Sequence, residues 1–241
     1  TGINGWEFSV EGYYKDMRNV LEYKDGVSFF GSSSGWENKV EMGKGRSAGI
    51  EFMAQKTAGK TTGWLSYTLS KSDRKFTKGG INNGEWFPYK YDRRHSINLT
   101  INHKFSDRID IGASWVFYTG GTSTIPEEKT TVIRPHNGAN NGFLWYGTYD
   151  NTNSSPTIGD VSYIEHRNNF RLPASHRLNL GVNFNKKTKH GMRTWNISLY
   201  NAYNAMNPAW VYRGHNKQGL SVIKKYTLLP LIPSFTYTYK F

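Results

Sequence analysis

The stretch "HSINLTINHKF", residues 95–105, decides the fold class. Branched aliphatic side chains occupy alternate positions, and short polar side chains fill the gaps: Ile97, Leu99 and Ile101 against Asn98, Thr100 and Asn102. Successive side chains of a β-strand point to opposite faces, whereas a helix brings every third or fourth residue to one face. The stretch therefore predicts a β-strand with one apolar face and one polar face.

The same alternation recurs along the whole chain, and the helical period of about 3.6 residues is almost absent. The sequence predicts about eight strands, near residues 6–17, 45–57, 61–73, 93–105, 108–120, 173–185, 192–204 and 224–241. The predicted fold class is all-β and antiparallel.

The connections between these strands alternate in length. Short polar turns lie at 57–63, 106–108 and 186–191, and long polar insertions lie near 18–44, 74–92, 121–172 and 205–223. Transmembrane β-barrels have short periplasmic turns and long outer loops, whereas a soluble β-sandwich has no physical reason to alternate them. The pattern predicts a barrel in the bacterial outer membrane. Its C-terminus is expected on the periplasmic side, because the last strand runs inward.

Composition excludes several other classes. The 241 residues contain no Cys, which excludes a disulfide framework and thiolate metal sites. No apolar run approaches the roughly 20 residues of a spanning helix, and residues 1–20 show no signal peptide. The net charge is +13, but the basic residues are scattered, so nucleic acid is not an expected partner. Lys and Arg near the membrane rims complement anionic lipopolysaccharide.

The polar positions carry information on barrel size, because most of them hold Ser, Thr, Asn or Gly. An eight-stranded barrel has an interior just wide enough to be filled by side chains, and small residues would fill it badly. The sequence therefore predicts that these strands form part of a larger barrel.

Several stretches resemble the C-terminal part of a TonB-dependent outer-membrane receptor in the style found in Bacteroidetes. They are "GKGRSAGIEF" (43–52), "YDRRHSINL" (91–99), "LPASHRLNLGVNF" (172–184), "ISLYNAYNAMNP" (197–208) and "LLPLIPSFTYTYKF" (228–241). The resemblance implies a barrel of about 22 strands with a plugged lumen, used for energised nutrient uptake. Plug and earlier strands are not expected within this chain.

The resemblance also implies partners. These are the remainder of the receptor in the same or a separate chain, the TonB-type energy-coupling complex, the barrel assembly machinery and a surface lipoprotein lid. The closing strand places aromatic side chains at every second position, and it resembles the signal that the assembly machinery reads: Phe235, Tyr237, Tyr239 and Phe241.

Aromatic residues in the long loops are candidate ligand contacts, since such rings stack on sugars, rings or peptide side chains. They are Trp86, Tyr89, Trp145, Tyr146, Tyr149 and Trp210. Packing of one loop against another is the alternative role, and it is the more common one for buried aromatic residues.

No catalytic arrangement is present in the sequence, so neither enzymatic activity nor a cofactor is expected. The seven His show no metal-ligand spacing. The stretch "DNTNSSPTIGD" (150–160) has no Gly at its sixth position, and Val161 stands where a calcium-binding EF-hand loop needs Glu. No metal site is predicted. Two other readings stay open: a self-contained small barrel acting as an adhesin or anchor, and a soluble β-sandwich that binds a partner.

Overall fold

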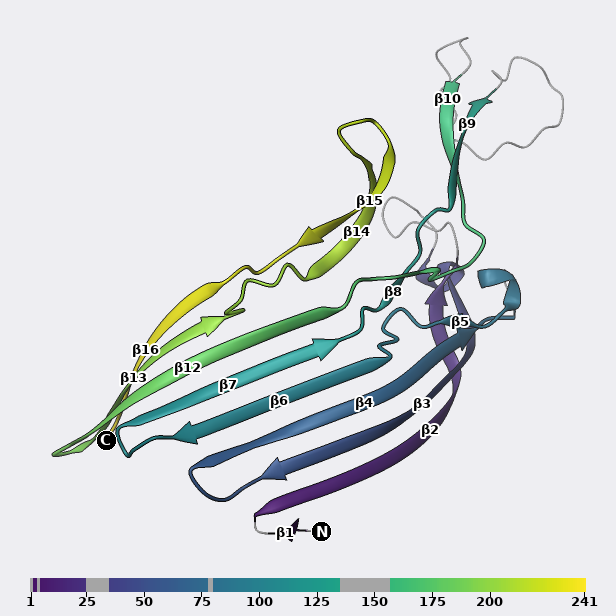
Figure 1. The fold of residues 1–241 in the computed structure, drawn as a ribbon. Coiled ribbons are helices and arrows are strands. Elements are labelled where there is room, and N and C mark those ends of the chain that lie inside the picture. The colour runs from purple at the N-terminus through teal and green to yellow at the C-terminus, as the bar shows by residue number, and fades with distance from the viewer. Residues whose placement is uncertain (1, 4, 25–34, 78–79, 135–156) are drawn as a thin grey trace.

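The computed structural model describes residues 2–3, 5–24, 35–77, 80–134 and 157–241. These residues form one long antiparallel sheet, with three small two-stranded sheets at one end (Figure 1). The strand order in the long sheet is β1-β2-β3-β4-β6-β7-β12-β13-β16, and β5 pairs with the end of β4. Neighbours in the sheet therefore follow one another along the chain. The prediction of an all-β antiparallel fold is confirmed.

The strands of the long sheet are β1 (Gly2–Ile3), β2 (Trp6–Tyr23), β3 (Val40–Lys56), β4 (Thr61–Lys75), β5 (Phe87–Pro88), β6 (His95–Lys104), β7 (Ile109–Tyr118), β12 (Ser175–Thr188), β13 (Gly191–Tyr200) and β16 (Ile232–Lys240). The small sheets pair β8 (Thr122–Ser123) with β11 (Phe170–Arg171), β9 (Glu128–Arg134) with β10 (Thr157–Tyr163), and β14 (Pro208–His215) with β15 (Ser221–Thr227). Two short 3-10 helices, η1 (Trp36–Lys39) and η2 (Ile81–Gly84), lie in the loops.

The register keeps apolar positions level across the sheet. Leu65 pairs with Leu99, Leu99 with Trp115, and Trp115 with Leu178. One position further along the strands, Thr100 pairs with Ser114 and Ser114 with Asn179. We call the two sides the apolar face and the polar face. The alternation in the sequence therefore places apolar side chains on one face of the sheet and polar side chains on the other. Trp64, on the polar face, is an exception.

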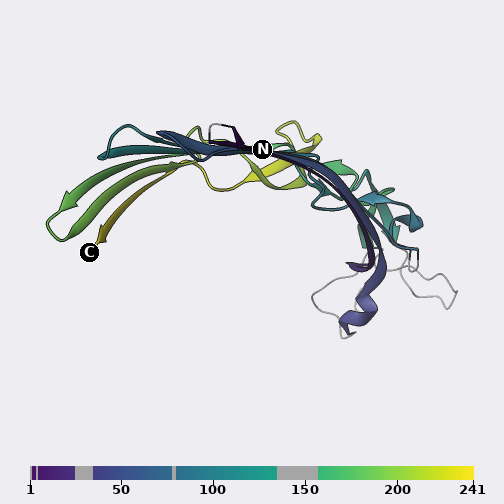
Figure 2. The ribbon, with the colours of Figure 1, turned by 90° about the horizontal axis from the view of Figure 1, so that it is seen from below.

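The sheet is a single curved layer, and nothing in the described residues covers its apolar face (Figure 2). Val10 is 69% exposed and Phe235 is 64% exposed. Among the described residues, a small cluster of Phe76, Ile81 and Phe87 at the long-loop end is the only conventional core. Burying one large apolar side chain yields about 1.5–3 kcal/mol, so a whole face of them requires a non-aqueous environment. The described part of the chain does not form a two-layer sandwich.

The long sheet is open at both edges in the part of the chain that the structure describes. β16 pairs only with β13, while β1 covers just two residues of β2. The short turns lie together at one end of the sheet and the long loops at the other (Figure 1). The described residues thus form a section of wall rather than a closed barrel. No helix among them is long and apolar enough to cross a membrane.

Several strand boundaries differ from those expected, and two of the differences have local backbone reasons. β2 runs on to Tyr23, past the expected end at residue 17, because a bulge at Asn19 (φ 58°) shifts the alternation by one residue. The expected strand 224–241 is two strands: β15 ends at Thr227, Leu229 has a left-handed backbone (φ 59°), and β16 begins at Ile232. The apolar run between them conceals this break in the sequence.

Candidate functional site

The candidate functional surfaces of this wall are its polar face, the network at the long-loop end, the last long-loop hairpin and the closing strand. On the polar face, a ladder of amides leads from a carboxylate towards the sheet edge. Both Asp110 oxygens accept hydrogen bonds, from Asn183 Nδ2 and from Asn185 Nδ2, each at 2.7 Å. Asn183 Oδ1 then accepts from Asn196 Nδ2, and Asn185 Oδ1 from Thr194 Oγ1, again at 2.7 Å. The ladder gives this part of the polar face a continuous hydrogen-bonded, hydrophilic surface.

At the long-loop end, an ion pair ties separate loops to the wall. Arg171 Nη2 lies 2.6 Å from Asp92 Oδ2, while its Nη1 donates to the carbonyls of Asp92 and Gly120. The other oxygen of Asp92 accepts from the backbone N–H of Ser72 on β4 at 2.7 Å. Asp92 is almost completely buried. We call this group the rim network. It fixes the loop that follows β4 against the loop that follows β7.

Asp92 and Arg171 are not among the site residues that the sequence predicts. Asp92 lies inside the motif "YDRRHSINL", and Arg171 directly precedes "LPASHRLNLGVNF". A buried carboxylate requires a paired cation, but nothing in one sequence indicates which of its many Arg residues lies opposite.

Three arginines on the polar-face side stack on tyrosines near the same end. The guanidinium carbon lies 4.1 Å from the ring centroid for Arg74 on Tyr89, 3.9 Å for Arg93 on Tyr118 and 4.3 Å for Arg177 on Tyr200. Among the described residues, none of these arginines forms an ion pair with a carboxylate. Guanidinium groups bind carboxylate and phosphate through paired hydrogen bonds, so this surface suits an anionic partner.

The predicted loop aromatics are distributed over different surfaces. Tyr89 belongs to the rim: its ring contacts Arg74 and Tyr91, and its carbonyl accepts from Thr122 Oγ1 at 3.0 Å. Trp86 instead stacks on Arg46 at 4.3 Å, and Arg46 lies on the apolar-face side of β3. Trp145, Tyr146 and Tyr149 lie outside the described residues.

Trp210 projects from the last outer hairpin, β14–β15. Its ring stacks on Tyr226 across the hairpin, with centroids 4.3 Å apart and planes within 9°, yet it remains half-exposed. Stacking removes rotamer freedom before any ligand arrives, so this indole is a pre-organised contact surface. The predicted ligand contacts therefore do not form one cluster in the described residues, and their role stays a prediction.

The closing strand β16 pairs with β13 along its whole length. Its alternating aromatics fall on the apolar face, where Tyr237 lies opposite Trp195 with ring centroids 4.4 Å apart. Phe241, the last residue, is fully exposed. The geometry leaves the aromatic rings of Phe235, Tyr237, Tyr239 and Phe241 available to lipid or to a partner protein. Their role as an assembly signal stays a prediction.

Across the described residues, no group of three or more His, Asp or Glu side chains is arranged to hold a metal ion. The site chemistry is that of hydrogen bonding, stacking and charge pairing.

Comparison with known proteins identifies one matching family. The sequence profile described as "TonB dependent receptor-like, beta-barrel" matches residues 1–205. Among curated protein sequences, none matches the chain significantly.

One similar solved structure is the ferripyoverdine receptor of the outer membrane of Pseudomonas aeruginosa, bound to ferripyoverdine, with 11% identity and a TM-score of 0.49. The match covers 97% of this chain and 24% of the receptor, so the chain spans about a quarter of that protein's length.

Proposed function

We propose that this chain, which belongs to the TonB-dependent receptor-like β-barrel family, forms part of the barrel wall of a receptor that imports a nutrient across the outer membrane. Members of this family are transport receptors rather than enzymes. The particular resemblance to receptors of the Bacteroidetes style rests on the sequence motifs alone.

The observation that carries the proposal is the register of the open sheet. Pairing keeps Leu65, Leu99, Trp115 and Leu178 on one face and Thr100, Ser114 and Asn179 on the other. β6 and β7 are each 10 residues long, within the roughly 9–11 residues that a tilted strand needs to cross a membrane. A single layer with one lipid-compatible face and one hydrophilic face is the wall of a water-filled or plugged barrel.

The orientation follows from loop length. Long loops lie outside in transmembrane barrels and short turns lie in the periplasm. The turns after β3, β6 and β12 are short, so we place that end of the sheet, together with the C-terminus, in the periplasm. The polar face then lines the lumen, and the rim network lies at the outer opening.

The partners follow from the open edges of the sheet. β16 needs a strand beyond it, and β2 needs more than the two residues of β1. We assign these places to the remaining strands of the receptor, which would also hold the plug and its connection to the TonB-type complex. Barrel assembly machinery would insert the wall, lipopolysaccharide would surround it, and a surface lipoprotein lid would cover it.

Ligand capture is assigned to the outer loops. Trp210 on the last hairpin and Tyr89 at the rim are the described candidates, together with Trp145, Tyr146 and Tyr149. Trp86 stacks on the apolar-face side, which argues for a place on the outside of the wall. The three Arg–Tyr stacks favour a ligand, or a plug surface, that carries negative charge.

The first experiment is the mass of the detergent-extracted particle under native and then denaturing conditions. We expect the native particle to contain this wall together with a plug and further strands. A heat-modifiable species of 27.6 kDa that runs alone would instead favour the small anchoring barrel. Loss of nutrient uptake on removal of the energy-coupling complex then tests transport itself.

A ligand-binding series tests the loop assignment. Tyr89→Ala and Trp210→Ala are expected to weaken ligand binding by the intact receptor, and Trp86→Ala is the comparison on the other face. Equal losses from all three variants would contradict the division between lumen and exterior.

A further inference from the structure

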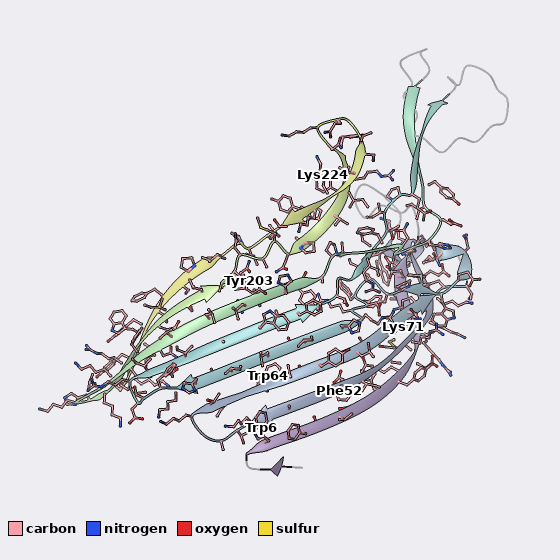
Figure 3. The ribbon with its side chains drawn as sticks, viewed as in Figure 1. Trp6, Phe52, Trp64, Lys71, Tyr203 and Lys224 are labelled. Carbon is pink, nitrogen blue, oxygen red and sulfur yellow. The ribbon has the colours of Figure 1, made fainter. Side chains whose placement is uncertain are left out.

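Beyond the apolar band, the outer face of β2, β3 and β4 carries charged residues in register. The cross-strand sets, in order towards the long loops, are Tyr14–Ala48–Lys71, Asp16–Arg46–Asp73 and Arg18–Lys44–Lys75. All of these positions share the face of Phe8, Phe52 and Leu65, because they follow the same alternation along their strands. Figure 3 shows Lys71 nearer the long-loop end of the sheet than Phe52.

In the middle set, Asp16–Arg46–Asp73, the charge of Asp73 is paired with Arg46 and with Lys71. Asp73 Oδ2 accepts from Arg46 Nε and lies close to Arg46 Nη2, each at 3.0 Å, and Lys71 Nζ is 3.5 Å away. The Asp73 carboxylate is buried, and Trp86 covers the Arg46 guanidinium. This set forms a fixed base at the edge of the apolar band.

The upper set consists only of cations, and we call it the cationic row: Arg18, Lys44 and Lys75. Lys44 lies directly opposite both of the others. Side chains opposite each other in a sheet have Cβ atoms about 4.5–5.5 Å apart, and like charges there destabilise the pairing.

Nearby carboxylates do not neutralise this row. Among the described residues, Lys44 and Lys75 form no ion pair, and Arg18 only approaches Asp16 at 3.8 Å while remaining 82% exposed. A row of this kind is expected where an external anion supplies the missing charge.

The position of the cationic row along the membrane normal indicates where the anion comes from. Ala48 is the last apolar position on this face of β3 before the charged sets begin, and Lys44 lies four residues beyond it. At about 3.3 Å per residue and a tilt of about 45°, this separation is roughly 9 Å along the membrane normal. Such a displacement moves the row out of the hydrocarbon and into the headgroup layer.

We infer that Arg18, Lys44 and Lys75 bind the phosphate groups of a phosphorylated glycolipid of the outer leaflet, of the lipid A type. The inference rests on the proposed orientation, with the long loops outside. The choice of an amphiphile rests on the order of these surfaces on one face: the apolar band ends at the middle set, and the cationic row lies one set further along. One molecule can therefore place its acyl chains on the band and its phosphates on the cations. An acidic soluble protein would use the row and leave the band uncovered.

The test compares charge-removal variants of the intact receptor in detergent. The row variant carries Arg18→Gln, Lys44→Gln and Lys75→Gln. The matched control carries Lys186→Gln, Lys189→Gln and Arg193→Gln, with the same charge change at the short-turn end. Bound lipid is counted by native mass spectrometry, with bisphosphorylated lipid A, dephosphorylated lipid A and inorganic phosphate as the probes.

With each cation near a lipid surface contributing about 1 kcal/mol, the row variant is expected to bind bisphosphorylated lipid A about 100-fold more weakly. The control variant keeps its affinity, and a Lys44→Arg, Lys75→Arg variant retains binding because the charge is kept. Without lipid A, the row variant is at least as heat-stable as the parent, since repulsion is relieved.

Three results would overturn the inference: unchanged affinity in the row variant, equal binding of dephosphorylated lipid A, or an equal loss in the control. Stabilisation by inorganic phosphate that matches lipid A would overturn the lipid source. Nutrient uptake is measured separately, so a failure of the transport proposal would not be mistaken for a failure of lipid binding.

Discussion

Arg171 and Asp92 are 79 residues apart in sequence, and their side chains meet at 2.6 Å at the long-loop end of the wall. The carboxylate of Asp92 also holds the N–H of Ser72 on β4, so one buried group anchors two loops and a strand. The loops above a barrel wall are usually its most variable part. Here their bases are fixed by a charged network, and only their outer portions are free to differ.

Removal of Asp92 should loosen this base. Asp92→Ala leaves Arg171 without its carboxylate, and breaking a buried ion pair in this way costs about 3 kcal/mol. We expect a lower unfolding temperature and faster proteolysis within residues 120–172. Arg94→Gln is the control, since Arg94 approaches Asp92 only at 3.7 Å. Similar behaviour of the two variants would show that the network has no special role.

The two faces of β6 should respond in opposite ways to a charge. Leu99→Arg puts a cation on the apolar face and should destabilise the barrel by about 2–4 kcal/mol in a bilayer. Thr100→Arg places the same side chain on the polar face and should cost much less. Unfolding in lipid vesicles measures both values. The assignment of the faces would be refuted by a larger penalty at Thr100.

Asn201 should be needed for the geometry after β13. It is completely buried, adopts a left-handed backbone (φ 54°) and donates from Nδ2 to the carbonyls of Ala205 and Leu229. Each buried hydrogen bond contributes about 1 kcal/mol net, so Asn201→Ala should cost roughly 2–3 kcal/mol.

Asn204→Ala is the matched control for that measurement. Asn204 has nearly the same backbone angle (φ 53°), but its Oδ1 accepts a single bond, from Leu231. Thermal unfolding should therefore separate the side-chain contribution from the backbone strain. Equal losses would assign the effect to the backbone alone.

The closing aromatics should matter for assembly more than for folding of the rest. Phe241→Ala combined with Tyr239→Ala should sharply reduce the amount of protein in the outer membrane, while total expression stays unchanged. Thr238→Ala, on the polar face of the same strand, is the control. Normal membrane levels of the double variant would remove the basis for an assembly signal at this terminus.

Much of the wall can be predicted from the sequence, because the alternation of apolar and polar residues indicates a β-strand with two different faces. A register shift of one residue would turn every apolar side chain of a strand to the other face, so the faces fix the pairing. The sequence alone could not show the bulge at Asn19 or the break at Leu229. Each of them depends on one residue that adopts a left-handed backbone. This conformation leaves no mark in the pattern of apolar and polar residues.

The candidate site was harder to predict for a different reason. Tyr89 and Trp86 are neighbours in one loop, yet Tyr89 contacts Arg74 on the polar-face side and Trp86 contacts Arg46 on the apolar-face side. Their side depends on how the loop turns back over β4. Partners such as Arg171 come from a distant loop, and a single sequence gives no measure of that proximity.

The turn at Leu229 also makes the last hairpin an interchangeable part. β14 and β15 pair only with each other, and β16 takes its register from β13 after the turn. The segment from Pro208 to Thr227 can therefore be exchanged or lengthened without moving the aromatic positions that close the wall. A receptor built in this way can acquire a new ligand through replacement of the β14–β15 hairpin. Selection on insertion into the membrane acts on β16, which is a separate segment.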